Sequence, residues 1–251
     1  MSTINSPVRS PVRSKDKPLE SKVALITGAS RGIGLAIARS LAALGAKVAL
    51  CARDPQRLIA AAADLERHGV PVLAVPADLS SSQQITPLVQ KVEQSFGPVE
   101  ILVNNAGIGV FGPIQDATEA SWDAVLDTNL KSVFLLSRAI APGMIARRSG
   151  HIINIASLAG KNAFAGGSLY CASKWGLLGL TECMAEDLRP FGIRVSAVCP
   201  GSVSTDFAPL GRKDPTKMLQ PEDVAHAVEV ILTQAPQSFI SEILLRPTQK
   251  P

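Results

Sequence analysis

The chain has 251 residues, of which 46% are hydrophobic and 18% are charged, and its formal net charge is +4. This composition supports a large buried core and excludes a chain that is disordered over most of its length. No run approaches the roughly 18 apolar residues of a membrane span, and the N-terminal segment lacks the apolar core of a signal peptide. We therefore expect neither an integral membrane protein nor a secreted one.

The N-terminal segment differs in composition from the rest of the chain. It contains the duplication Ser6–Arg9 and Ser10–Arg13, and it has too few apolar residues to offset the entropy of folding. Four of its residues are basic and one is acidic, so most of the net charge lies here. We expect residues 1–18 to form a disordered basic arm and residues 19–251 to form one folded catalytic domain.

The remaining composition argues against two further classes of function. With little net charge on the folded part and only 4% aromatic residues, we expect no nucleic-acid binding and no membrane binding, although a role of the basic arm in either stays open. The cysteines show no metal-ligand spacing, so we expect no metal site. Free thiols, mostly buried, indicate a reducing compartment and a cytoplasmic location. The four are Cys51, Cys171, Cys183 and Cys199.

From residue 22 onward, short β-branched or aliphatic runs alternate with longer segments whose apolar residues recur at helical spacing. Strands that are apolar on both faces and alternate with helices are typical of a parallel sheet covered on both sides. We predict an α/β fold: a single doubly wound domain with a seven-stranded parallel sheet, flanked by helices on both faces, that binds ligands at the carboxyl ends of its strands. A long connection over residues 202–220 is predicted to form a lid. The predicted strands are Val23–Thr27, Lys47–Cys51, Val70–Val75, Ile101–Asn104, His151–Ala156, Arg194–Val198 and Glu242–Leu245, and the predicted helices are Ile33–Leu44, Arg57–His68, Ile85–Phe96, Trp122–Arg147, Ser168–Leu188 and Pro221–Thr233.

A glycine-rich loop, Thr27–Gly34, connects the first predicted strand directly to a helix. Gly28 allows a tight turn, Gly32 lets backbone amides approach a pyrophosphate, and Gly34 lets the helix pack closely on the strand. The amides and the dipole at the helix N-terminus attract the anion. In this context the loop favours a dinucleotide site over a simple turn.

The end of the second predicted strand favours NADP(H) over NAD(H). Enzymes that use NAD place a carboxylate about 20 residues past the glycines, whereas this strand ends in Ala52 and Arg53. Asp54 precedes Pro55 and fits the N-cap of the next helix. Arg53, joined by Arg31, can bind a 2′-phosphate through charge-assisted hydrogen bonds. The alternative is that both arginines are simply solvated.

A serine, a tyrosine and a lysine follow the fifth predicted strand. Ser157 lies at the end of this strand, and Tyr170 and Lys174 lie four residues apart on one face of the next helix. A free phenol has a pKa of about 10, and an ammonium about 5 Å away lowers it by about two units. We expect Tyr170 to act as an acid and base in a site that excludes water. An exposed Tyr–Lys pair would be ordinary helix surface.

Together these motifs resemble the short-chain dehydrogenase/reductase family from about residue 22 to residue 247, and in particular its NADP-dependent 3-oxoacyl-[acyl-carrier-protein] reductase-like members. The resemblance implies a Rossmann fold, and a homo-oligomer, tetramer or dimer, built through helices around Trp122–Arg147 and Ser168–Leu188. It implies the catalytic residues Asn129, Ser157, Tyr170 and Lys174. The cofactor-binding residues that it implies are Gly28, Ser30, Arg31, Gly32, Ile33, Gly34, Arg53, Asp78, Leu79, Asn105, Ala106, Gly107, Tyr170, Lys174, Pro200, Gly201, Val203 and Thr205.

The resemblance also implies a role for each catalytic residue. Tyr170 gives a proton to a carbonyl oxygen that Ser157 hydrogen-bonds, while the nicotinamide delivers a hydride to the carbon. Lys174 lowers the pKa of the phenol and binds the nicotinamide ribose, and Asn129 holds a water that relays protons. Structural alternatives stay open: Asn129 could cap or kink its helix, Ser157 could cap the next helix, and Asp78 could be a turn residue.

We expect NADPH-dependent reduction of a ketone or aldehyde, such as a 3-oxoacyl compound, to an alcohol. Two alternatives stay open, namely an NAD(P)-dependent alcohol dehydrogenase that works oxidatively and a dinucleotide-sensing module without catalysis. The substrate depends on Phe164, the loop Gly109–Phe111 and the segment Phe207–Leu219. Their composition indicates a modest, partly apolar substrate.

Overall fold

A computed structural model describes residues 17–207 and 214–251 of the chain. The expected N-terminal arm lies outside the described residues except for Lys17 and Pro18, and residues 208–213 of the predicted lid also lie outside them. The backbone N–H of Leu19 donates to the Leu44 carbonyl oxygen, and the Leu19 side chain is buried. The chain is therefore packed against the domain from this residue onward.

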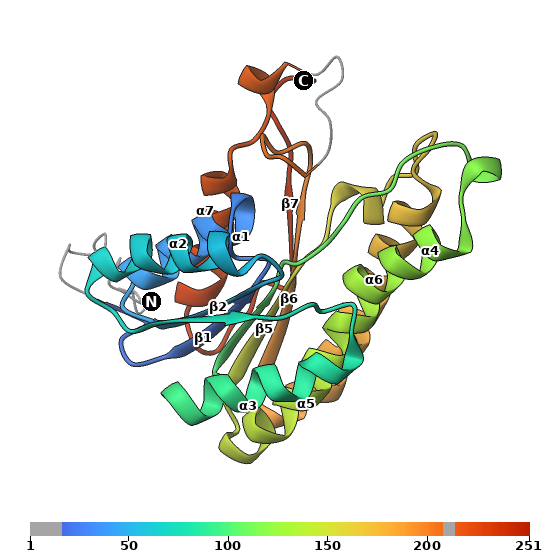
Figure 1. The fold of residues 1–251 in the computed structure, drawn as a ribbon. Coiled ribbons are helices and arrows are strands. Elements are labelled where there is room, and N and C mark those ends of the chain that lie inside the picture. Colours follow the sequence, from blue (N-terminus) through green and yellow to red (C-terminus); the bar gives the residue numbers. More distant parts are fainter. Residues whose placement is uncertain (1–16, 208–213) are drawn as a thin grey trace, which may run out of the picture.

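Seven parallel strands form one sheet in the order β3-β2-β1-β4-β5-β6-β7 (Figure 1). The strand order reverses between β1 and β4, which are neighbours in the sheet although two strands separate them in the sequence. A ligand crevice is expected outside the carboxyl ends of the strands at such a point. The strands are β1 (Val23–Thr27), β2 (Lys47–Ala52), β3 (Val72–Pro76), β4 (Ile101–Asn104), β5 (Gly150–Ile155), β6 (Ile193–Pro200) and β7 (Glu242–Leu245).

Helices cover both faces of this sheet (Figure 1), which confirms the predicted doubly wound α/β fold. One face carries α1 (Gly32–Ala43), α2 (Pro55–Leu65) and α7 (Pro221–Thr233). The other carries α3 (Ile85–Phe96), α5 (Ser132–Arg147) and α6 (Ser168–Leu188), and α4 (Glu119–Leu126) lies beside α6. Within the described part of the chain, no helix is both long enough and apolar enough to cross a membrane.

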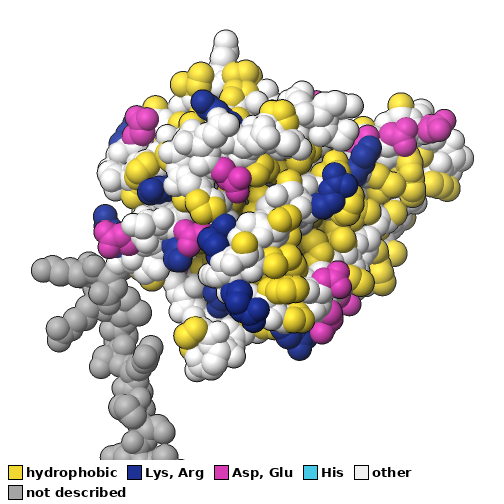
Figure 2. Space-filling view, turned by 90° about the horizontal axis from the view of Figure 1, so that it is seen from below, with side chains coloured by type: hydrophobic (Ala, Val, Ile, Leu, Met, Phe, Trp, Pro, Cys, Tyr) yellow, Lys and Arg dark blue, Asp and Glu magenta, His cyan; other side chains and the backbone are white. Residues whose placement is uncertain are grey.

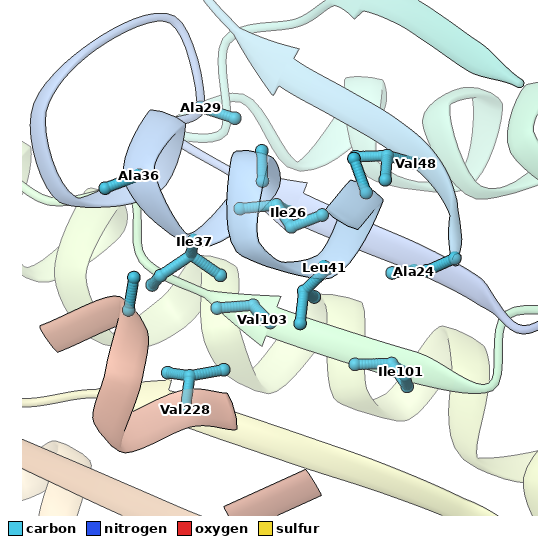
Figure 3. Packing of buried hydrophobic residues seen from close by; sticks show 14 of the residues in the cluster. Ala24, Ile26, Ala29, Ala36, Ile37, Leu41, Val48, Ile101, Val103 and Val228 are labelled. Atoms are coloured by element: carbon cyan, nitrogen blue, oxygen red, sulfur yellow. The ribbon is translucent and has the colours of Figure 1, made fainter. Parts of the chain in front are cut away.

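The core under α1 fixes the position of the glycine-rich loop. Ile37 and Leu41, one helical turn apart on α1, are fully buried against the sheet, where Ile26 of β1 and Val103 of β4 lie (Figure 3). Val228 of α7, which packs beside α1, belongs to the same cluster (Figure 3). Burying each such side chain contributes about 1.5–3 kcal/mol. This packing holds the start of α1 at the carboxyl end of β1.

The predicted helix Trp122–Arg147 is divided in the structure. α4 ends at Leu126, a π-helical segment spans Asp127–Lys131, and α5 follows and accommodates Pro142. A π-helical segment adds one residue to a helical turn and occurs frequently at functional sites. Sequence periodicity does not reveal it, because the apolar spacing continues on both sides. Asn129 lies within this segment, where the helix departs from α-helical geometry.

Candidate active site

A cleft of about 1350 Å³ lies at the carboxyl ends of the strands, where loops that follow β1 to β7 meet. The predicted site residues line this cleft, with two exceptions. Gly34 and Asn129 do not line it but contact residues that do. The topology thus brings together residues that lie far apart in the sequence.

The glycine-rich loop has the geometry of a phosphate cradle. Gly28 and Gly32 have φ angles of +64° and +55°, which side chains rarely adopt. A Cβ on Gly28 would lie 2.9 Å from the Cα of Ala106, and one on Gly34 would lie 2.5 Å from Nδ2 of Asn105. No side chain caps the N-terminus of α1, so its first amides are open to a ligand. The residues present therefore fit the pyrophosphate of a dinucleotide.

Two loops are tied together at this cradle by Thr27 and Asn105. The hydroxyl of Thr27 donates to the Val103 carbonyl oxygen at 3.3 Å and accepts from the backbone N–H groups of Asn105 and Ala106, both at 3.0 Å. Nδ2 of Asn105 donates back to the Thr27 carbonyl oxygen at 2.9 Å. Asn105 thus fixes the loop after β4 to the loop after β1.

The structure distinguishes the two arginines that are predicted to bind a 2′-phosphate. Both line the cleft, but Nη1 of Arg31 lies 3.0 Å from Oδ2 of Asp206, a partner that the sequence did not indicate. Arg53 has no ion-pair partner within residues 17–207 and 214–251. The predicted N-cap is confirmed, because Oδ1 of Asp54 accepts from two backbone amides of the first turn of α2 at 3.0 and 3.1 Å. This cap makes α2 begin at Pro55, two residues before the predicted start.

Asp78 is a turn residue at the edge of the cleft. Its Oδ1 accepts hydrogen bonds from the backbone N–H of Ser80 at 3.0 Å and from the Ser80 hydroxyl at 2.8 Å. Asp78 and Leu79 also line the cleft beside the end of β2. The turn interpretation is confirmed, and a contact of Asp78 with the cofactor stays a prediction.

Ser157, Tyr170 and Lys174 meet in the buried part of the cleft. Ser157 follows β5, and its Oγ accepts from the backbone N–H of Ala159 at 3.1 Å, so it caps a short 3-10 turn as one alternative predicted. The phenol of Tyr170, only 9% exposed, forms a hydrogen bond with the Ser157 side chain. Nζ of Lys174 lies 5.8 Å from the centroid of the Tyr170 ring and donates to the Ile155 carbonyl oxygen at 2.9 Å. Neither side chain lies in bulk solvent.

Burial controls the protonation of this pair and corrects one expectation. Burial raises the pKa of Tyr170 to about 12, and the hydrogen bond with Ser157 opposes that rise only in part. Burial also lowers the pKa of Lys174 to about 8. The expected lowering of the phenol pKa is therefore wrong for the free protein, because desolvation of the phenolate raises this pKa instead. Tyr170 consequently stays protonated at neutral pH.

The carboxamide of Asn129 makes three hydrogen bonds with the protein. Its Oδ1 accepts from the backbone N–H of Ile108 at 2.8 Å, and its Nδ2 donates to the Ile108 carbonyl oxygen at 2.9 Å and to Oγ of Ser173 at 3.0 Å. These bonds hold the loop after β4 against α6. A Cβ on Gly107 would lie 3.2 Å from Oδ1 of Asn129 and 3.8 Å from Nζ of Lys174. Asn129 therefore lies close to Lys174.

A buried row of hydrogen bonds positions α6, and the sequence reasoning missed it. Nδ2 of Asn104 on β4 donates to Oδ1 of Asn154 on β5 at 2.9 Å, and Nδ2 of Asn154 donates to Oγ1 of Thr181 on α6 at 2.8 Å. All three side chains are buried. An asparagine near the end of each of two neighbouring apolar strands was the available signal. The row sets the position of the helix that carries Tyr170 and Lys174.

The C-terminal residues 246–251 also line the cleft. No pattern in the sequence predicted this position. Pro247 lies beside Gly201, since a Cβ on Gly201 would lie 3.0 Å from Cδ of Pro247. All four cysteines are free thiols, and Cys183 is the one that is exposed. Within the described ranges, no three His, Cys, Asp or Glu side chains stand together as a metal site.

Several known proteins are similar to this chain in sequence and in fold. Residues 22–215 match the family model described as short chain dehydrogenase. A ketoacyl reductase proposed for the granaticin polyketide synthase of Streptomyces violaceoruber is 46% identical over 188 residues, which are 74% of this chain and 69% of that protein. An uncharacterized oxidoreductase of Staphylococcus saprophyticus is 36% identical over 230 residues, which are 91% of this chain and 98% of that protein.

Solved structures of the same family are similar to this chain in fold and sequence. A metagenomic short-chain oxidoreductase in complex with NADP superposes with a TM-score of 0.83 at 48% identity, over 92% of this chain and 99% of that one. An alcohol dehydrogenase from the archaeon Thermococcus sibiricus, complexed with 5-hydroxy-NADP, has a TM-score of 0.84 at 31% identity, over 92% of this chain and 98% of that one. The chain is an oxidoreductase and belongs to the short-chain dehydrogenase/reductase family.

Proposed function

We propose that the protein reduces a ketone or aldehyde to an alcohol with NADPH, and that 3-oxoacyl thioesters are among its candidate substrates. The observation that carries this proposal is the joint burial of Ser157, Tyr170 and Lys174 in the cleft, with a hydrogen bond between Ser157 and Tyr170. The likeness to a ketoacyl reductase and to an NADP-bound oxidoreductase supports it.

Different residues of the chain donate the proton to the carbonyl oxygen, hydrogen-bond it and stabilise the phenolate. NADPH, when bound, supplies the hydride that reduces the carbonyl carbon. Tyr170 donates its phenolic proton to the oxygen, since a pKa of about 12 keeps this proton in place at pH 7. The oxygen of Ser157 accepts from an amide, and its hydroxyl hydrogen turns from the Tyr170 oxygen to the developing alkoxide. Lys174, charged below a pKa of about 8, stabilises the phenolate that remains.

The protonation state of Tyr170 suits the reductive step. A phenol that stays protonated at neutral pH is ready to donate, whereas alcohol oxidation requires the phenolate as base. The same residues serve oxidation at a higher pH, so the assay is run in both directions. Asn129, next to Gly107 and Lys174, is assigned the relay of protons to the lysine through a water.

NADP(H) is the proposed cofactor. Ala52 ends β2 at the place where an acidic residue would bind a ribose 2′-hydroxyl, and the adjacent Arg53 lines the cleft without an ion-pair partner in the described part of the chain. Arg–phosphate contacts contribute about 1.5–3 kcal/mol each. The other cofactor contacts proposed are those inferred from the sequence, from Gly28 to Thr205.

A homo-oligomer is part of the proposal. Hydrophobic side chains gather in a band on the α3 and α5 side of the molecule (Figure 2). Trp122 on α4, Phe134 on α5 and Trp175 on α6 are 41%, 43% and 54% exposed. Leu177 and Leu178 of α6 are buried in the core and do not contribute to this exposed surface. Light scattering measures the oligomeric state: we expect the mass of a dimer or tetramer, and Phe134→Asp should lower that mass.

A cytoplasmic location is also proposed. What supports it is that all four cysteines are free and that three of them, Cys51, Cys171 and Cys199, are buried. Free buried thiols are typical of reducing compartments.

A screen of carbonyl compounds that follows NADPH absorbance tests the proposed reaction. We expect carbonyl-dependent oxidation of NADPH, and much less of NADH. If no ketone or aldehyde in a broad panel promotes oxidation while NADPH still binds, the protein is a dinucleotide-sensing module. If alcohols with NADP⁺ react and carbonyls do not, the oxidative alternative holds.

A further inference from the structure

Three phenylalanine side chains form a cluster beside Tyr170, two of them in contact with its ring. Phe111 lies in the loop after β4, Phe164 in the loop after β5, and Phe207 in the loop after β6. The ring centroids of Phe111 and Phe207 lie 5.5 and 5.6 Å from that of Tyr170, and the centroid of Phe164 lies 6.1 Å from that of Phe111. We call these three phenylalanines the aromatic cluster. It is assembled from three neighbouring strands of the sheet.

The rings of the aromatic cluster are tilted rather than stacked. The planes of Phe111 and Tyr170 form an angle of 64°, and those of Tyr170 and Phe207 form 54°. Edge-to-face and tilted contacts are the favoured geometries of aromatic pairs. The cluster therefore holds defined ring orientations around Tyr170.

Much of this ring surface is open to the cleft. Phe111, Phe164 and Phe207 are 43%, 48% and 42% exposed, and all three line the cleft, whereas Tyr170 is almost covered. Aromatic residues exposed side by side in a concave site mark a place where a ligand covers them. The open ring surface lies directly beside the proton donor.

Two glycines make room for these rings. A Cβ on Gly109 would lie 2.6 Å from Cε2 of Phe111 and 3.0 Å from Cε1 of Phe207, and a Cβ on Gly167 would lie 2.7 Å from Cζ of Phe164. Either Cβ would displace the ring next to it. The sequence thus places a residue without a side chain where each ring needs space.

The part of the cleft wall formed by the loops after β4 and β5 is uncharged. The lining residues of these two loops are small, apolar or neutral, such as Gly107, Ile108 and Ala163. None of them would pair with a charged substituent next to the reacting carbonyl. The polar groups that reach the carbonyl itself are the hydroxyls of Ser157 and Tyr170.

We infer that the site selects carbonyl compounds that carry a flat aromatic group next to the carbonyl, namely aryl ketones and aryl aldehydes. The inference rests on the proposed reductase function. The aryl ring lies against the tilted rings of Phe111 and Phe207, and its carbonyl oxygen reaches the phenol of Tyr170. A saturated ring of the same size gains apolar contact but not the ring–ring attraction.

A matched pair of ketones tests this. Acetophenone and cyclohexyl methyl ketone share one carbon skeleton and differ in whether the ring is aromatic. kcat/KM with NADPH is measured for both on wild type, Phe111→Leu, Phe207→Leu and Gly109→Ala. We expect each variant to lower the ratio of acetophenone to cyclohexyl methyl ketone by about 2- to 10-fold.

Phe96→Leu is the matched control. Phe96 ends α3 and is partly buried against the core, far from the cleft lining. This variant should leave the ratio unchanged. Both ketones are measured on one preparation, so loss of folded enzyme cancels in the ratio, and their different intrinsic reactivities cancel between wild type and variant.

The outcomes separate this inference from the proposed function. Ratios that stay at the wild-type value in Phe111→Leu, Phe207→Leu and Gly109→Ala overturn the inference but leave the reductase function standing. Reduction of aliphatic ketones without reduction of acetophenone does the same. If no carbonyl compound is reduced at all, the proposed function itself is wrong and the inference goes with it.

Discussion

Nζ of Lys174 lies 5.8 Å from the ring centroid of Tyr170, one turn away on the same face of α6, and it is held by the Ile155 carbonyl oxygen. Burial acts on the two groups in opposite senses: it raises the pKa of the phenol to about 12 and lowers that of the ammonium to about 8. Between these values the folded protein holds a protonated phenol beside a neutral amine. At pH 7 both groups carry their protons.

Replacing Tyr170 by phenylalanine removes the proposed proton donor and leaves the ring. We expect Tyr170→Phe to lower kcat for carbonyl reduction by about 100-fold or more, the usual scale for lost acid catalysis. The affinity for NADPH, measured by fluorescence titration, should persist because the glycine cradle is untouched. Turnover at the wild-type level would refute the assignment of Tyr170.

The charge of Lys174 sets the pH dependence of reduction. The phenol is protonated up to a pKa of about 12, so the first group to titrate on the alkaline side is Lys174. We expect kcat/KM for NADPH, which reports the free protein, to fall as the pH rises above about 8. In Lys174→Arg the guanidinium stays charged, so this alkaline limb should be absent, whatever the absolute rate. A limb that persists unchanged in this variant would contradict the assignment.

Lys174 also lowers the stability of the folded protein. Its pKa falls from 10.5 in the unfolded chain to about 8 on folding, so burial of the charged form costs free energy at pH 7. We expect Lys174→Met to raise the free energy of unfolding at pH 7 by about 1–3 kcal/mol in urea titrations without cofactor. The unfolded chain binds more protons than the folded one between pH 8 and 10.5, so the difference should shrink over that window. A variant that is less stable than wild type at pH 7 would show that no such cost exists.

The fold could be predicted because it depends on local pattern. Runs such as Val23–Thr27 are apolar on both faces, and the intervening helices have long apolar stripes, so a covered parallel sheet follows. The order of the motifs then identifies which loops meet at the carboxyl edge. Local pattern does not reveal the π-helical segment Asp127–Lys131, because the spacing of apolar residues continues unchanged through it.

The residues that meet in the cleft could be predicted, but their environment could not. Whether Lys174 lowers the pKa of Tyr170 depends on how many neighbours exclude water, and no spacing in the sequence encodes that. The pairing of Arg31 with Asp206 joins residues 175 positions apart in the sequence. The same holds for the row of hydrogen bonds through Asn154, because it forms only after β4, β5 and α6 have assembled.

The two arginines of the cleft should differ in their effect on the cofactor. We expect Arg53→Ala to weaken NADPH binding by roughly 10- to 100-fold and to leave NADH binding nearly unchanged. Arg31→Ala should have a smaller effect, because Asp206 already neutralises that guanidinium. Dissociation constants from calorimetry check this, with Arg39→Ala on the outer side of α1 as control. Equal losses for both cofactors in Arg53→Ala would count against a 2′-phosphate site.

His151 has a defined tautomer in the core between β5 and β6. The hydroxyl of Ser196 donates to the Ile240 carbonyl oxygen at 2.6 Å, so at 2.9 Å from Nε2 of His151 it can only accept. Nε2 therefore carries the proton, and Nδ1 has no hydrogen-bond partner in the described part of the chain. Burial, with a smaller contribution from Arg194, lowers the pKa of His151 to about 3.

This histidine should make the protein sensitive to acid. The unfolded chain takes up a proton on His151 below its ordinary pKa of 6.5, whereas the folded protein does not until about 3, so stability is lost as the pH falls through that window. At pH 5 the loss is about 2 kcal/mol relative to pH 8. Urea unfolding at both values should show that His151→Gln, which keeps a donor for Ser196, loses about 2 kcal/mol less than wild type. The exposed His68, replaced by glutamine, serves as the control, and an equal acid loss in wild type and His151→Gln would show that another group is responsible.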